Sequence, residues 1–184
     1  MFSCSALLNF TNYHSGTMTK FSTEVRLLFC AMLCFGIAST ANADRSKKAL
    51  KSLEEGSYYE ALEDLEKSIE KDSINTSAYY VYALLYSTSE FPEYDVDTAH
   101  HFVLKSLKDH ERSDDKQLKE LEKLERGLND ITSLKIKIDS LGFEEALSAH
   151  TIERYEHFMS LYPSATQFET AINKRNALIY ANVT

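Results

Sequence analysis

The sequence predicts an all-α protein, and three observations predict it. The chain of 184 residues contains only 5 glycines and 2 prolines, whereas sheet-rich folds have many tight turns that use both residues. Leu, Glu, Lys and Ala, which favour helices, are plentiful. Apolar residues beyond Asp44 recur mostly at spacings of three and four, which places them on one face of a helix.

Residues 1–43 are expected to form a secretory signal peptide rather than part of the fold. Lys20 and Arg26 precede an unbroken apolar run over residues 27–38. The small residues that follow end in an Ala-x-Ala exit at Ala43, which is typical of signal-peptidase cleavage. The run has 12 residues, whereas a helix that spans a bilayer needs about 20. We therefore expect no stable membrane insertion after cleavage.

Two other interpretations of the apolar run are open, and so is the start of the chain. The run is also compatible with a buried core helix. A lipoprotein would need a small residue before an acylated cysteine, where this chain has Leu33 before Cys34. Residues 1–17 contain no Lys, Arg, Asp or Glu, so Met18, close to the basic residues, is an alternative start.

Charge and cysteine content exclude two classes of site. The formal net charge is -8, and general nucleic-acid binding needs a basic footprint. All three cysteines lie before residue 35, so the rest of the chain forms neither a disulfide nor a thiolate metal site. We expect a protein or peptide partner and no nucleic acid.

About eight helices are expected beyond the signal peptide, divided between residues 44–110 and 111–184. Their expected bounds are a first helix closing over 49–54; 58–69 after a turn at 55–57; one capped by Thr76 or Ser77; one begun by Asp97 or Thr98; 114–126, ended by Gly127; one from Asp130 or Thr132 to His150; one from Thr151 to Pro163; and 169–180. A coiled coil is an alternative for 114–126, but its apolar repeat covers fewer than the three or four heptads that a coiled coil needs.

A repeat pattern occupies residues 45–109. It consists of Gly56-Ser57-Tyr58-Tyr59-Glu60-Ala61-Leu62, then Leu65, Ile69, Asp72 and Asn75, then Ala78-Tyr79 and Ala83. This pattern resembles the tetratricopeptide repeat (TPR), a family of antiparallel helix pairs in units of about 34 residues. Two departures are Ser73, where the family has proline, and a second turn before Ala99 that is longer by about four residues.

The resemblance implies the arrangement of the helices and the kind of function. Helical hairpins would stack into a short right-handed solenoid, with the small residues Ala49, Ala61, Ala83 and Ala99 at the helix contacts. The groove of such a solenoid suits extended peptides or helices. A degenerate second block, over residues 143–171, resembles segments of exported bacterial proteins with TPR-like arrays.

No catalytic, cofactor or metal site is expected. The sequence has neither a Gly-x-Ser-x-Gly elbow nor a glycine-rich phosphate loop. His100 and His101 are adjacent and therefore point about 100° apart on a helix. His150 and His157 are seven residues apart, but an expected helix boundary falls between them. We expect structural or surface roles for these histidines and predict that the protein is not an enzyme.

Tyr80, Leu84 and Ser87 are the candidate binding residues. Tyr79, Tyr82 and Tyr86 share one face of the predicted helix and are expected in the core. Tyr80, Leu84 and Ser87 point elsewhere and would line the concave surface of a hairpin as a peptide-binding groove, where an aromatic ring supplies contact area. The alternative is that the first face is core and that Tyr80 has no binding role.

These observations favour an exported adaptor that binds a protein partner in the periplasm or at the cell envelope. A structural spacer module from a longer envelope protein is a second hypothesis, because residues 177–180 are too apolar for a capping helix. A metal-dependent hydrolase is a third hypothesis.

The signal-peptide interpretation predicts a mature protein that begins at Asp44. Replacing Ala43 with arginine should block processing, because signal peptidase needs a small residue before the cleaved bond. N-terminal sequencing and intact mass of the protein isolated from cells check both outcomes, with Asn42→Gln as the control. Purified wild-type protein that retains residues 27–38 would contradict the prediction.

Overall fold

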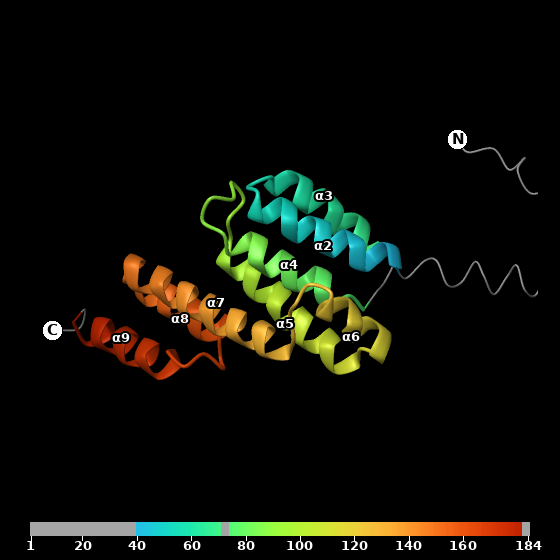
Figure 1. The fold of residues 1–184 in the computed structure, drawn as a ribbon. Helices are drawn as coiled ribbons and strands as arrows, with labels where there is room; N and C mark the ends of the chain where they lie inside the picture. The colour runs from blue at the N-terminus through green and yellow to red at the C-terminus, as the bar shows by residue number, and fades with distance from the viewer. Residues whose placement is uncertain (1–39, 71–73, 182–184) are drawn as a thin grey trace, which may run out of the picture. The chain divides into compact units, whose positions relative to one another are not determined.

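The computed structural model describes residues 40–70 and 74–181, and these ranges form eight helices and no strand. The helices are α2 (Thr40–Glu54), α3 (Tyr58–Ile69), α4 (Thr76–Tyr86), α5 (Val96–Arg112), α6 (Asp115–Glu122), α7 (Leu128–Ala149), α8 (Ile152–Leu161) and α9 (Phe168–Ala181) (Figure 1). The predicted all-α class is confirmed for this part of the chain. Most of the predicted signal peptide, residues 1–39, lies outside the described residues.

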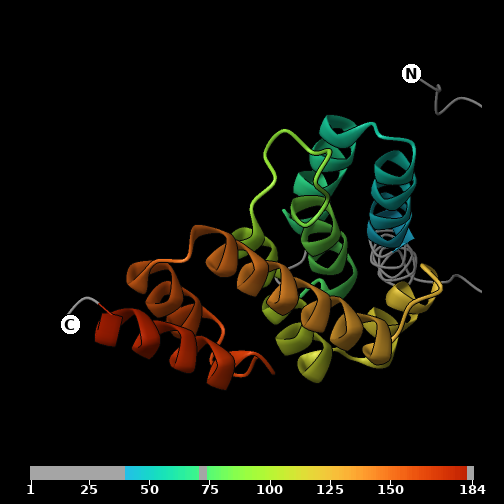
Figure 2. The same cartoon turned by 90° about the vertical axis from the view of Figure 1, so that its left-hand side faces the viewer.

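Helices that are neighbours in the chain pack against one another. The strongest pairings join α4 with α5, α2 with α3, and α5 with α7, and α8 also packs against α9. Helix α4 also contacts α2 and α3. Helix α7 packs against α5 on one side and α8 on the other (Figures 1 and 2). None of the described helices is both long enough and apolar enough to cross a membrane.

The turn between α2 and α3 lies where the sequence predicts it. Gly56 has a φ of 77°, a left-handed conformation that favours glycine. The Ser57 N–H donates to the Ser52 carbonyl over 2.8 Å, and the Gly56 N–H donates to the Leu53 carbonyl over 3.0 Å. This hydrogen-bond pair satisfies the last carbonyls of α2 and reverses the chain.

Helix α4 is buried on nearly all sides rather than along one stripe. Its buried residues are Thr76, Ser77, Ala78, Tyr79, Tyr80, Val81, Tyr82, Ala83 and Leu85. The sequence of α4 has no charged residue, and a helix that is apolar all round belongs in an interior. Contacts with α2, α3, α5, α6 and α7 supply the cover.

Small residues allow the helices around α4 to approach closely, as the sequence predicts. Ala49, Ala61, Ala83 and Ala99 are all fully buried. Aromatic rings fill the space beside them, and the ring centroids of Tyr82 and Phe102 lie 4.5 Å apart, nearly parallel.

The long turn between α4 and α5 is anchored by one aromatic side chain. Phe91 is 2% exposed, and its ring lies 5.8 Å from Tyr58 and 5.4 Å from Tyr86. The Asp95 N–H also donates to the Tyr86 carbonyl over 3.1 Å. Burial of Phe91 therefore holds the predicted insertion against both adjoining hairpins.

Asn75 joins the first two hairpins through buried hydrogen bonds. Its side-chain oxygen caps α4 by accepting from the Ala78 N–H over 3.1 Å. Its side-chain nitrogen donates to the Ser68 carbonyl on α3 over 3.1 Å, and its backbone N–H donates to Asp109 on α5 over 2.9 Å. A buried side chain with all these groups paired fixes the register of three helices.

Four expected helix ends differ from the structure: the starts of α4, α5 and α7, and the end of α6. Asn75 caps α4 instead of Thr76 or Ser77, and Asp95 caps α5 instead of Asp97 or Thr98. Helix α6 ends at Glu122, and Glu125, not Gly127, takes the left-handed conformation after it. In each N-terminal case an earlier Asn or Asp reaches the free N–H groups, and these side chains are among the best N-caps.

Gly127 begins α7 rather than ending α6. Its N–H donates to the Asp130 carboxylate over 2.8 Å, so the expected helix start at Asp130 or Thr132 is replaced by Leu128. Helix α7 then continues through Gly142 to Ala149. The expected end at His150 and the Thr151 cap of α8 are both confirmed.

Gly142 is required by a close contact with Tyr162. A Cβ atom on Gly142 would lie 2.7 Å from the Tyr162 Cζ. Tyr162 has little freedom to move, because it is 1% exposed and its hydroxyl donates to Asp97 over 2.7 Å. The glycine therefore lets α8 pack on α7.

Replacing Gly142 with alanine should lower the free energy of unfolding by roughly 1–2 kcal/mol, because overpacking against Tyr162 outweighs the gain in helix propensity. Urea denaturation followed by circular dichroism measures the change. In a Tyr162→Leu background the ring is absent, and the same alanine should stabilise by about 1 kcal/mol relative to that background. Equal effects in the two backgrounds would contradict the packing argument.

Candidate functional site

The three residues predicted to line a peptide groove do not form an open surface. Tyr80 is 5% exposed and Ser87 is 8% exposed, while Leu84 is half-buried. The Ser87 hydroxyl donates to the Leu84 carbonyl over 3.0 Å. The prediction of an open groove at these residues is wrong. The helical spacing left this face of α4 outside the expected core, but neighbouring helices cover it.

The buried side chain of Tyr80 instead lies against the turn between α6 and α7. The Arg126 guanidinium lies beside its hydroxyl and, with Asp130, forms the polar surroundings of the ring. Burial raises the pKa of Tyr80, and the Arg126 charge partly opposes that rise. The hydroxyl therefore stays protonated at neutral pH and is a neutral partner of Arg126.

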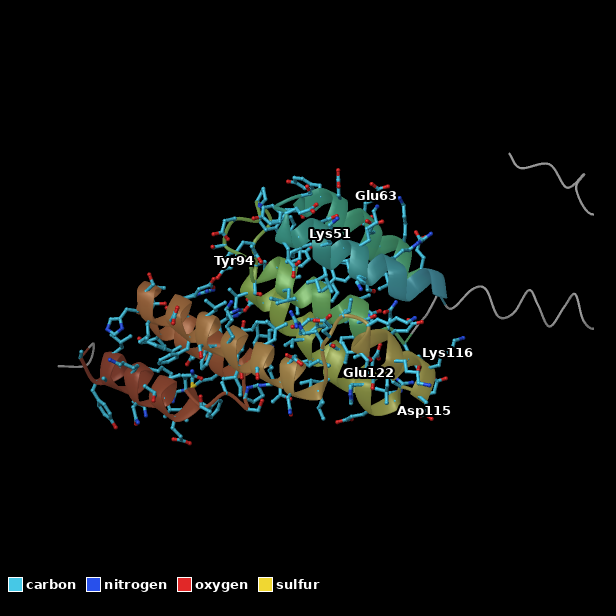
Figure 3. The ribbon with its side chains drawn as sticks, in the orientation of Figure 1. Lys51, Glu63, Tyr94, Asp115, Lys116 and Glu122 are labelled. Atoms are coloured by element: carbon cyan, nitrogen blue, oxygen red, sulfur yellow. The ribbon has the colours of Figure 1, made fainter. Side chains whose placement is uncertain are left out.

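A groove of about 490 Å³ lies between α2 and this turn. We call it the basic groove, and it is lined by Lys47, Lys48, Leu50, Lys51 and Glu54 of α2 and by Lys123, Leu124, Glu125 and Arg126. Its volume falls within the range of about 300–1,000 Å³ that is usual for ligand sites. Lys51 marks its α2 side and Glu122 marks the end of α6 on the other side (Figure 3).

Five cations and two carboxylates line the basic groove. Lys48 Nζ lies 2.9 Å from Asp64, and Lys51 Nζ lies 3.6 Å from Glu55. Within the described ranges, the exposed Lys47 and Lys123 ammonium groups have no ion-pair partner. The groove therefore keeps an excess of positive charge on a chain whose net charge is -8.

The turn that carries Lys123 and Arg126 has a fixed conformation. Glu125 has a φ of 57°, a left-handed conformation that costs a residue other than glycine roughly 1–2 kcal/mol. Its N–H donates to the Glu122 carbonyl over 2.8 Å, and its own carbonyl accepts from Arg126 over 3.1 Å. Such strain persists only where surrounding contacts determine the backbone.

The floor of the groove is apolar and its walls are cationic. Leu50 is 9% exposed and Leu124 is 5% exposed. The neighbouring Asp64 carboxylate raises the pKa of Lys48, so that this side chain stays charged under physiological conditions. The arrangement favours an anionic group beside the cations and a short apolar group over the two leucines.

His100 lies in a buried ion-pair cluster between α5 and α7. Its Nε2 is 3.4 Å from Asp139, and the other oxygen of that carboxylate lies 2.6 Å from Lys135 Nζ. The Tyr162 ring covers the histidine with a centroid distance of 4.2 Å. His101 is exposed on another face of α5, so the adjacent histidines point apart as the sequence predicts.

His150 and His157 also have separate partners. His157 Nε2 lies 2.6 Å from Asp97, and His150 Nδ1 lies 2.8 Å from the Tyr155 hydroxyl. The second oxygen of Asp97 accepts from Tyr162, so Asp97 joins α5 to α8. In the described part of the chain, no group of three or more His, Cys, Asp or Glu side chains is placed to hold a metal ion.

A second hollow of about 400 Å³ lies along the surface of α5. It is lined by His101, Leu104, Lys105, Lys108, Asp109 and Arg112. Two of these are already engaged, because Lys105 Nζ lies 4.0 Å above the Tyr79 ring and Asp109 accepts from Asn75. The basic groove differs in having two walls that are distant in sequence and a floor of two leucines, which makes it the stronger candidate.

The basic groove could not be predicted from the sequence, because its two walls are about 70 residues apart in the chain. A weak signal was present in the lysines at positions 47, 48 and 51. Spacings of three and four place such residues along one side of a helix, but they do not reveal the opposite wall.

None of the protein-family models, curated proteins or solved structures that were compared matches this chain.

Replacing Tyr80 with phenylalanine should lower the free energy of unfolding at pH 7 by roughly 0.5–1.5 kcal/mol, because Arg126 loses the hydrogen bond that it shares with the Tyr80 hydroxyl. The pKa of Tyr80 is raised in the folded state, so its contribution is complete below the unfolded value of about 10 and is lost as pH rises towards the folded pKa. The difference between wild type and variant should therefore shrink above about pH 10.

Urea denaturation at neutral and alkaline pH measures this difference, since the other tyrosines contribute equally to both proteins. Tyr59→Phe is the matched control, because Tyr59 is 58% exposed. A Tyr80→Phe effect that equals the Tyr59→Phe effect at both pH values would contradict the supporting role of Tyr80.

Proposed function

We propose that the chain is a non-catalytic interaction scaffold of helical hairpins that binds a protein partner. The observation that carries this proposal is the basic groove, in which α2 and the α6–α7 turn bring unpaired cations together above an apolar floor. Rigid helices hold both walls, and a fixed surface binds a partner without a large ordering cost.

The TPR resemblance supports the same function. The alanines that the resemblance assigns to helix contacts are fully buried, and α2–α3 and α4–α5 are adjacent pairs. Proteins built from such pairs present surfaces for extended peptides or helices. We include a TPR-like solenoid arrangement in the proposal.

The polar clusters of the chain favour binding over catalysis. The two oxygens of Asp97 are taken by His157 and Tyr162, and the Asp139 carboxylate lies between His100 and Lys135. These contacts join helices, which is a structural use of titratable side chains. The predicted signal peptide places the proposed scaffold in the periplasm or at the cell envelope.

Site-specific photo-crosslinking tests the scaffold function. Benzoylphenylalanine is introduced one position at a time at exposed residues of each hairpin, including Lys47, Tyr59, Lys123, Lys137 and Lys174. We expect one partner protein, identified by mass spectrometry, to crosslink from a contiguous group of positions in the envelope fraction. Folded and correctly localised variants that crosslink to no protein from any position would contradict the function.

A further inference from the structure

We propose that the basic groove binds an acidic peptide segment of a partner protein, with its carboxylates on Lys47, Lys123 and Arg126 and an apolar side chain over Leu50 and Leu124. This inference rests on the proposed scaffold function and names the partner chemistry. The observations behind it are the charge of the groove, the separation of its walls and its apolar floor.

Charge complementarity identifies the ligand as anionic. Lys47 and Lys123 lie on opposite walls, and both ammonium groups are exposed. A carboxylate between two such cations forms charge-assisted hydrogen bonds, which are roughly twice as strong as those between neutral groups. The chain as a whole has a net charge of -8, so the excess of cations at this groove attracts an anionic partner locally and not through the net charge of the protein.

Arg126 is held in place by two neighbours. Its guanidinium lies beside the Tyr80 hydroxyl and donates to the Glu125 carbonyl over 3.1 Å. The left-handed conformation of Glu125 fixes the backbone of the turn that carries Glu125 and Arg126. A guanidinium that is held before binding loses little conformational freedom when it pairs with a carboxylate.

The two carboxylates at the groove favour a peptide over a nucleic acid. Glu54 and Glu125 line the site together with the cations, and closely spaced phosphates would meet them as well as the lysines. A peptide has sparse carboxylates, and its backbone N–H groups can donate to Glu54 or Glu125. The leucine floor also suits an amino-acid side chain, whereas nucleic-acid binding depends on an extended basic surface.

Fluorescence anisotropy with a defined peptide tests the inference. The probe is a short fluorescein-labelled peptide in which glutamates alternate with leucines, added to the purified protein at low and physiological ionic strength. Binding should weaken as salt rises, because exposed charge pairs are screened. A matched peptide with glutamine in place of glutamate should bind with an affinity that is lower by about fivefold or more.

Charge-reversal variants locate the binding site. Lys47→Glu and Lys123→Glu should each weaken binding of the acidic peptide by about fivefold, because each removes an attraction and adds a repulsion. Lys174→Glu makes the same charge change on an exposed residue of α9 and should leave the affinity within about twofold. Lys47→Arg keeps the charge and should keep the affinity. Circular dichroism verifies that each variant is folded.

Three outcomes would overturn the inference: no binding of the acidic peptide by folded protein, binding that Lys47→Glu and Lys123→Glu leave unchanged, or preferential binding of a single-stranded oligonucleotide or anionic vesicles through these lysines. The photo-crosslinking experiment separates this failure from failure of the scaffold function. A partner crosslinked only from positions outside the groove would preserve the scaffold and reject the acidic-peptide site.

Discussion

The burial of α4 on nearly all sides is the constraint on which the rest of the structure depends. A helix without charged residues has little surface that water stabilises, so neighbours must cover most of it. The α2–α3 pair, α5 and the α6–α7 segment all contact it. Asn75 satisfies the first N–H groups of α4 and, through Ser68 and Asp109, sets how the covering helices align.

The position of the basic groove follows from the cover of α4. Tyr80 is buried on α4, and its hydroxyl lies beside Arg126 on the α6–α7 turn. Helix α2 packs on α4 as well, so the two walls meet because both contact the same hidden helix. The strain at Glu125 is opposed by that packing, since the contacts of Leu124 and Arg126 hold the turn in place.

Polar contacts join α5 to the segments that follow it, α7 and α8. Asp97 receives hydrogen bonds from α8, while the buried His100 faces Asp139 on α7. Asp139 is also held by Lys135 Nζ over 2.6 Å, whereas its other oxygen and His100 Nε2 lie 3.4 Å apart and make no hydrogen bond with a described residue. Gly142 belongs to the same arrangement, because only a residue without Cβ leaves room for the Tyr162 ring.

The sequence by itself determined the helical class, the Gly56 turn, the buried alanines, the C-terminal end of α7 and the N-cap of α8, because local spacing and capping chemistry act within a few residues. The spacing of Tyr80, Leu84 and Ser87 could not show that α4 is covered on several sides, since burial depends on helices distant in the chain. Only the tertiary structure decided that Lys47 and Lys123 share one groove, and that His150 pairs with Tyr155 and His157 with Asp97. Contacts of this kind join residues whose separation in sequence says nothing about their distance in space.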